Sequence, residues 1–283
     1  MSDRHANGAI AVAVAAVLAM AANNAAAADA KYPNWKGHWV PATPNATFDP
    51  TKPAGIAQQA PLTPEYQKGL EQSIADQGRG GVGNDAVAQC YAAGMPRMMS
   101  YHAQEYVITP DVTYILLGGD DNLRRVWTDG RDWPKTIAPT YQGYSLGHWV
   151  DEDGDGTYDA LEVDTRGPFK GPRSYDASGL PLHEDNESTF KERFFLDKAN
   201  PNILHDVITV TDHALTWPWT VDKTFVRHTD PLEEWPEEYC HVTNRNVLLG
   251  KENYRLDDNG VLMPTRPGQE PPDLRYFRPP PGR

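Results

Sequence analysis

Much of this chain alternates apolar and polar residues in short segments, and that alternation limits the folds open to it. It is clearest in residues 189–195, 203–210 and 219–226. Successive side chains of a strand point to opposite faces, so a period of two predicts strands buried on one face. Residues 112–117 and 123–127 flank a polar turn and predict a hairpin. Short strands, polar turns and little helix predict an all-β body, an antiparallel barrel or sandwich.

One short helix is expected before the strands. Thr63 and Pro64 are typical of an N-cap and a first helical position. Tyr66, Leu70 and Ile74 follow at four-residue intervals, and a glycine at 78 ends the pattern. We therefore expect an extended arm over residues 31–62, a single mainly β domain over 63–263 and a proline-rich tail over 264–283.

The N-terminus has the features of a secretory signal peptide. Residues 9–22 are an apolar run of about fourteen that follows Arg4 and precedes small residues. The run is too short to span a membrane, and no other apolar run approaches that length. We expect cleavage after Ala28 or Ala30, and a periplasmic or secreted protein.

The two cysteines, Cys90 and Cys240, predict one disulfide bond in an exported protein, with two buried free thiols as the alternative. The bond would close a loop of about 150 residues, for which chain entropy predicts a stabilisation of roughly 4–5 kcal/mol. The net charge of −13 argues against nucleic-acid binding and against adhesion to acidic lipid. Nothing in the sequence indicates an oligomeric state.

An acidic segment at residues 151–162 matches the twelve-residue calcium loop of EF-hands. Gly156 stands at the turn position, and the ligand positions are held by Asp151, Asp153, Asp155, Asp159 and Glu162. Neither flank forms a long amphipathic helix; residues 161–165 alternate as a strand does. We expect the loop to join two strands of a hairpin. It either binds structural calcium or is a solvated acidic turn.

Three residues are candidates for chemistry: His183, His148 and Arg131. His183 is followed by Glu184 and Asp185, and a neighbouring carboxylate raises the pKa of an imidazole and can prepare it for proton transfer. Arg131 could receive a substrate carboxylate or only pin a turn. The segment 143–147 matches the nucleophile elbow of α/β-hydrolases, but the helix that this motif requires does not follow it. The histidine spacing indicates no local zinc site.

Tryptophans near strand ends suggest a place for an apolar ligand, with core packing as the alternative. Those at predicted strand ends or turns are Trp127, Trp133, Trp149, Trp217 and Trp219. The leading hypothesis is an exported protein that binds a small, partly apolar or aromatic molecule. The second is a cofactor-independent lyase, isomerase or hydrolase with a histidine acid/base, since no nucleotide loop or haem-attachment motif is present. The third is a structural or interaction protein.

Several short segments together resemble an uncharacterised family of exported bacterial all-β proteins. The resemblance spans roughly residues 63–246 and rests on Cys90, Gly94-Met-Pro-Arg-Met-Met99, Thr128-Asp-Gly-Arg131, Gly143-Tyr-Ser-Leu-Gly-His-Trp149, Lys191-Glu-Arg193 and Pro218-Trp-Thr220. Relatives carry a shorter turn at residues 151–162, which implies that the acidic loop is an elaboration. They often carry arginine where this chain has His148. The family has no established activity, so the resemblance implies export and a shared fold but no mechanism.

Overall fold

The computed structural model describes residues 31–43, 47–119, 123–228, 235, 246–249, 252–256 and 262–270 of the 283-residue chain. The predicted signal peptide at 1–30, Cys240 and the last thirteen residues of the predicted tail lie outside the described residues. Within the described part, no helix is both long and apolar enough to cross a membrane.

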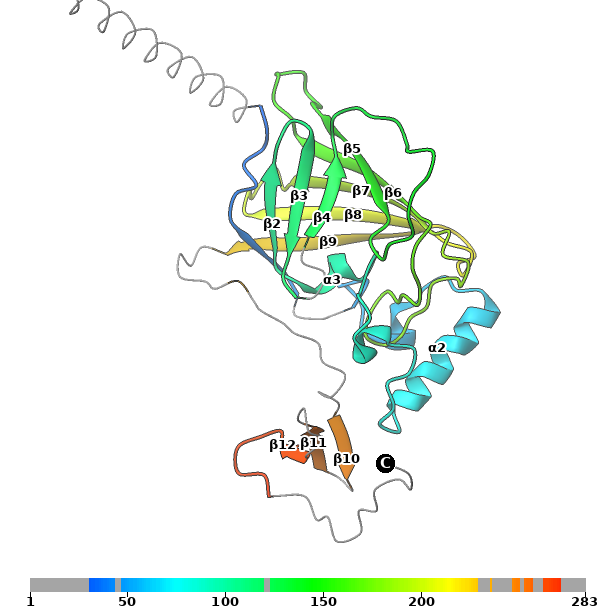
Figure 1. Ribbon diagram of the computed structural model, residues 1–283. Helices are drawn as coiled ribbons and strands as arrows, with labels where there is room; N and C mark the ends of the chain where they lie inside the picture. The colour runs from blue at the N-terminus through cyan, green and yellow to red at the C-terminus, as the bar shows by residue number, and fades with distance from the viewer. Residues whose placement is uncertain are drawn as a thin grey trace, which may run out of the picture.

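Nine strands of the described residues form one sheet that closes as a barrel in chain order (Figure 1). The ring closes where the first strand pairs with both the second and the last. The predicted all-β body is confirmed, and of the two predicted architectures it is the barrel. The strands are β1 (His38–Pro41), β2 (Gln104–Ile108), β3 (Val112–Leu117), β4 (Leu123–Trp127), β5 (Tyr144–Val150), β6 (Ala160–Arg166), β7 (Thr189–Leu196), β8 (Ile203–Thr211) and β9 (Trp219–His228).

One pair of neighbouring strands departs from the antiparallel pattern, because β4 and β5 run parallel. Parallel neighbours need a connection long enough to return to the starting end. Residues 128–143 supply it as a long loop on the outside of the sheet (Figure 1). The other neighbouring pairs are antiparallel, including the predicted β3–β4 hairpin and the β5–β6 hairpin around the acidic loop.

The arm expected to be extended contributes structure to the barrel. It supplies β1 and a 3₁₀ turn, η1 (Gly55–Gln58). Trp35 and Trp39 from this segment are fully buried, and the indole of Trp39 donates to the carbonyl of Trp35 at 2.9 Å. Burial of these two large rings stabilises a strand in a segment whose proline content had predicted extended chain. The segment predicted as an extended arm therefore contains one strand of the barrel.

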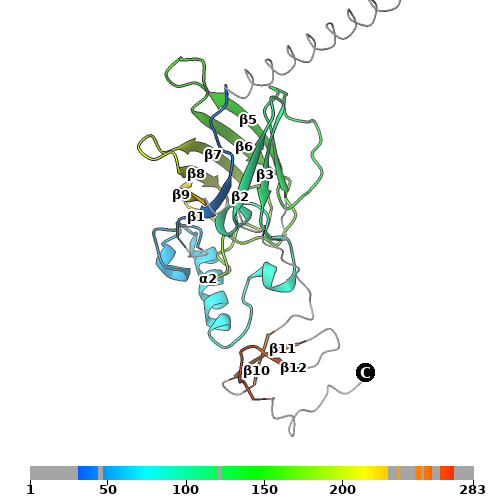
Figure 2. The ribbon, with the colours of Figure 1, turned by 90° about the vertical axis from the view of Figure 1, so that its left-hand side faces the viewer.

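The predicted helix is α2 (Pro64–Gln77). The hydroxyl of Thr63 accepts from the amide of Tyr66 at 3.5 Å, so Thr63 caps the helix as expected. Both views place α2 at one end of the barrel (Figure 1 and Figure 2). Two shorter elements follow, η2 (Ala86–Gln89) and α3 (Met98–Tyr101).

A separate three-stranded antiparallel sheet follows the barrel in the chain. Its strands are β10 (Asn246–Leu249), β11 (Glu252–Leu256) and β12 (Leu262–Pro264). The described strands after residue 228 thus form a second sheet and do not pair with the barrel strands.

The barrel interior is a packed core of aromatic and aliphatic side chains. The ring of Trp35 lies 5.1 Å from that of Tyr106 and 6.3 Å from that of Phe194. Phe190 and Phe225 are also buried within it. Core packing thus accounts for much of the aromatic content. The two ligand-sized pockets are lined largely by connecting segments outside this core.

Candidate functional site

A pocket of about 700 Å³ lies between α2 and the long connection from β6 to β7. We call it the α2 pocket. Its walls combine apolar surface with hydrogen-bonding groups. Among its lining residues are Tyr66, Gly69, Asn84, Arg173, Leu182 and His183.

Tyr66 and His183 form an aromatic part of the wall. Their ring centroids are 5.2 Å apart, and the Tyr66 hydroxyl accepts from the amide of Glu184 at 3.2 Å. Partial burial raises the pKa of Tyr66, so its hydroxyl stays protonated at neutral pH. The contact joins the helix, through Tyr66, to the loop that carries the histidine.

Arg173 places a buried positive charge at the pocket wall. Its Nη1 donates to the carbonyl of Met95 at 2.7 Å, and its Nη2 donates to the hydroxyl of Ser188 at 3.1 Å. That hydroxyl in turn donates to Asp212 at 2.6 Å. Burial lowers the pKa of Arg173 to about 10, which still leaves it charged at neutral pH. Within the described residues, no carboxylate lies within ion-pair distance of this guanidinium.

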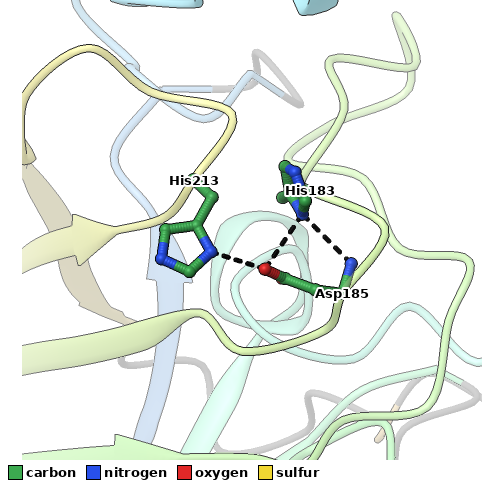
Figure 3. A group of neighbouring side chains, drawn as sticks. All are labelled: His183, Asp185 and His213. Atoms are coloured by element: carbon green, nitrogen blue, oxygen red, sulfur yellow. Dashed lines mark hydrogen bonds and ion pairs between the residues drawn. The ribbon is translucent and has the colours of Figure 1, made fainter.

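His183 and His213 converge on one carboxylate oxygen beside the pocket (Figure 3). The Oδ2 atom of Asp185 is 3.1 Å from Nδ1 of His183 and 2.5 Å from Nδ1 of His213. The hydrogen bond and charge of Asp185 raise the pKa of His213. Although partial burial works against ionisation of Asp185, its hydrogen bonds to the two imidazoles and to the amide of Glu187 hold its pKa below the usual value. The predicted neighbour of His183 is thus present, whereas His213 was missed.

The other two predicted catalytic residues lie elsewhere. Arg131 forms an ion pair with Asp129 at 2.6 Å, and its guanidinium lies 3.6 Å from the ring centre of Trp127. His148 projects from β5 and pairs with Glu162 at 3.2 Å, with its side chain 67 % exposed. Among the described residues, no hydrogen bond, ion pair or ring contact joins these two to each other or to His183. Arg131 therefore fits the alternative in which it only stabilises a turn.

Ser145, from the segment that matched a nucleophile elbow, is a buried strand residue. Its hydroxyl lies 2.8 Å from that of Thr165 and accepts from Arg124 at 3.3 Å. Gly143 enters β5 with φ +73°, and an added Cβ would lie 2.7 Å from the carbonyl of Arg166. The glycine therefore meets a backbone requirement. Ser145 is only 3 % exposed, although it lies at the edge of the second pocket described below.

A second pocket, of about 600 Å³, lies against the loop between β4 and β5. Trp127, Tyr141 and Tyr144 line it together with Arg125. The predicted tryptophans thus have different roles. Trp127 lines this pocket, Trp219 belongs to the core, and the partly buried Trp149 packs against the core. Arg166 stacks over Trp133, and Trp217 is 65 % exposed. Of the described residues, no histidine or carboxylate lines the second pocket, so they offer fewer groups for chemistry there than in the α2 pocket.

The acidic loop brings three of its five predicted metal ligands together. Carboxylate oxygens of Asp151, Asp153 and Asp159 lie within 4.8 Å of one another. Asp155 instead accepts from the amide of Thr157 at 2.7 Å. Glu162 forms an ion pair with Arg193 at 2.6 Å and also contacts His148. Glu162 belongs to β6 and lies opposite Arg193 on β7, so it does not join the three aspartates of the loop.

The barrel contains a buried network of charged residues that the sequence did not predict. Arg124 pairs with Glu192, and their side chains are 1 % and 0 % exposed. Asp206 and Lys223 face each other across β8 and β9 and are also buried. Burial raises the pKa of Asp206 well above its usual value and lowers that of Lys223 to about 8. The sequence contains one indication of this network. Phe190, Glu192 and Phe194 are two residues apart along β7, so Glu192 lies on the apolar face of the strand.

No protein-family model matches this chain, and a search of curated proteins found no match either. The family resemblance based on short segments therefore stays a prediction. The Cys90–Cys240 bond also stays a prediction, because Cys240 lies outside the described residues.

Proposed function

We propose that this chain is an exported protein that binds a small, partly apolar or aromatic molecule in the α2 pocket. The proposal rests on the residues that line this pocket, which include the apolar or aromatic Tyr66 and Leu182 and the polar Arg173 and His183. A concave site with apolar surface and a few convergent polar groups is typical of ligand pockets. The pocket's volume of about 700 Å³ is within the range of such sites.

The wall also limits the chemistry of the ligand. Arg173 favours an acceptor oxygen, because its charge has no direct carboxylate partner among the described residues. Glu65 and Glu184 also line the pocket and can accept from a hydroxyl group. A small aromatic molecule that carries hydroxyl or carboxyl oxygens fits this combination.

A second candidate is an acid/base enzyme at the same pocket. It is favoured by the contact between His183 and Asp185, since a carboxylate beside an imidazole is a common arrangement for proton transfer. Lyase or isomerase chemistry fits better than serine hydrolysis, because Ser145 is buried in the barrel wall. His148 is the weaker acid/base candidate, because it stands exposed beside Glu162 and does not line the α2 pocket.

Filling the pocket tests the binding proposal. Gly69 lies in α2 and lines the pocket, and a Cβ added there meets nothing within 4 Å. Gly69→Phe is expected to fold with unchanged or slightly raised stability, because glycine is a poor helix former. The added ring should abolish the melting-temperature increase that a bound molecule gives. A panel of small phenols and aromatic acids would be screened by thermal unfolding.

Ala75→Phe is the matched control, because Ala75 is exposed on the same helix and does not line the pocket. A molecule that stabilises the wild type and Ala75→Phe but not Gly69→Phe supports the proposal. A panel that stabilises all three proteins equally, or none of them, contradicts binding in this pocket and leaves the structural or interaction role as the better account.

We also propose that the protein reaches the periplasm or the exterior and forms the Cys90–Cys240 bond. The apolar segment at residues 9–22, ended by small residues, supports export. An oxidising compartment and an even number of cysteines support the bond.

Calcium is proposed as a structural ion of the acidic loop. Asp151, Asp153 and Asp159 offer the hard oxygen ligands that calcium takes. Millimolar calcium should raise the melting temperature of the wild type by mass action, and Asp153→Ala with Asp159→Ala should remove this increase. Glu162→Ala is the control, because Glu162 contacts Arg193 instead, and it should keep the response. An equal response in the double variant would place the calcium effect elsewhere.

A further inference from the structure

We propose that His183, Asp185 and His213 form a binding site for one divalent transition-metal ion. Each offers a donor atom, and the three donor atoms lie within 4.8 Å of one another (Figure 3). Two imidazoles and one carboxylate are a donor set suited to zinc, iron, cobalt or nickel, whereas calcium and magnesium prefer oxygen alone. The site does not depend on a small molecule in the α2 pocket.

The donor spacing is close to what an ion requires. Bonds of about 2.0–2.2 Å at tetrahedral or octahedral angles hold two donor atoms about 3.0–3.5 Å apart. The distance between His183 Nδ1 and Asp185 Oδ2 is 3.1 Å. His213 Nδ1 is 2.5 Å from the same oxygen and would move outward by under 1 Å, which its 65 % exposed side chain allows.

The surroundings of Nδ1 of His183 also suit a cation at this point. The amide of Asp185 donates to this nitrogen at 3.1 Å, and Oδ2 of Asp185 lies 3.1 Å from it. A metal ion accepts an electron pair from each of these two atoms. The amide of Asp185 then loses its hydrogen bond to the nitrogen.

One buried carboxylate holds together the two loops that supply the ligands. Oδ1 of Asp212 accepts from the amide of His183 at 2.9 Å and from the amide of Ala214 at 2.8 Å. It therefore fixes the connection before β7 and the turn after β8 in one arrangement. Such support behind the ligands is typical of metal sites, where the groups that hold the ligands contribute to affinity.

Three protein ligands leave a coordination position for water or another molecule. Because His183 also lines the α2 pocket, that position is close to bound small molecules. The metal site is therefore open, rather than closed and purely structural.

Cobalt and zinc titrations test the proposal with full-length mature protein that carries no affinity tag. Metal-free wild type should bind one Co²⁺ with the visible absorption of a nitrogen- and oxygen-bound ion, and Zn²⁺ should displace it. His213→Ala and His183→Ala should each weaken binding at least tenfold and lose the melting-temperature increase given by zinc. His213→Gln serves as a second variant if the alanine proteins fold poorly.

His148→Ala is the matched control, because His148 is 67 % exposed and pairs with a carboxylate, and no second histidine of the described residues contacts it. It should bind cobalt as the wild type does. The proposal is overturned if the wild type shows no saturable cobalt spectrum, or if the His183 and His213 variants bind as tightly as His148→Ala. Neither outcome would bear on the screen with Gly69→Phe, which reports on the pocket itself.

Discussion

Glu192→Ala is expected to lower the free energy of unfolding by about 3–5 kcal/mol, because it leaves the guanidinium of Arg124 buried without its counter-charge. Glu192 accepts two hydrogen bonds from Arg124, one of them at 2.8 Å. Arg124 also donates to Thr165 at 2.8 Å, so its direction is fixed and it cannot swing to solvent. Urea unfolding of the wild type and the variant would measure the difference.

Two further variants separate the loss of a counter-charge from general damage to β7. Arg193 follows Glu192 but projects from the other face of the strand, where it pairs with Glu162 and is 30 % exposed. Arg193→Ala should cost at most about 1 kcal/mol. Arg124→Met combined with Glu192→Leu should recover much of the loss, since apolar replacement of a buried ion pair is often neutral. Equal losses for Glu192→Ala and Arg193→Ala would contradict the network.

Raising the pH from 8 to 9.5 is expected to stabilise the wild type by roughly 1.5 kcal/mol relative to Lys223→Met. Burial lowers the pKa of Lys223 to about 8 in the folded protein, whereas lysine in the unfolded chain titrates near 10.4. Between these values the unfolded state binds more protons, so the free energy of unfolding rises with pH. Below pH 8 the ammonium is charged in both states, and its burial penalty is present in full.

The surroundings of Lys223 support this direction. Its ammonium donates to the carbonyl of Phe48 and to Ser100 at 3.1 Å, inside the barrel end. Asp206 lies opposite but balances the charge poorly, because burial raises the pKa of that carboxyl. Denaturant unfolding at the two pH values measures the effect. Lys198→Met, at an 85 % exposed lysine, is the control and should show no such difference from the wild type. A Lys223→Met protein that follows the wild type across this range would contradict a lowered pKa.

The sequence predicted the strands and the helix because those elements leave local patterns. Alternation located most of the strands, and the cap at Thr63 located the start of α2. The strand β1 left no such pattern, because four residues are too few to alternate convincingly and both of its pairing partners, β2 and β9, lie far along the chain. Parallel pairing of β4 with β5 could not be read either, since only the path of residues 128–143 decides it.

The candidate site was only partly predictable for the same reason. His183 and Asp185 are two residues apart, so their contact follows from the sequence. His213 reaches Asp185 only because the barrel brings the β8–β9 turn beside the connection before β7. His148 and Arg131 stood near glycines and acidic residues that suggested a site. Instead, His148 pairs with Glu162 on the neighbouring strand, and Arg131 pairs with Asp129 in the same loop.

Histidine NMR tests the central claim, ligand binding in the α2 pocket, most directly. Ring signals would be assigned with His183→Gln and His205→Gln and followed while pooled phenols and aromatic acids are added. His205 stacks on Phe195 at 4.8 Å on β8 and reports on a surface outside the pocket lining. The account predicts that at least one compound shifts the His183 signal in a saturable way and leaves His205 unmoved. A panel that moves neither signal, or moves His205 as much as His183, would contradict it.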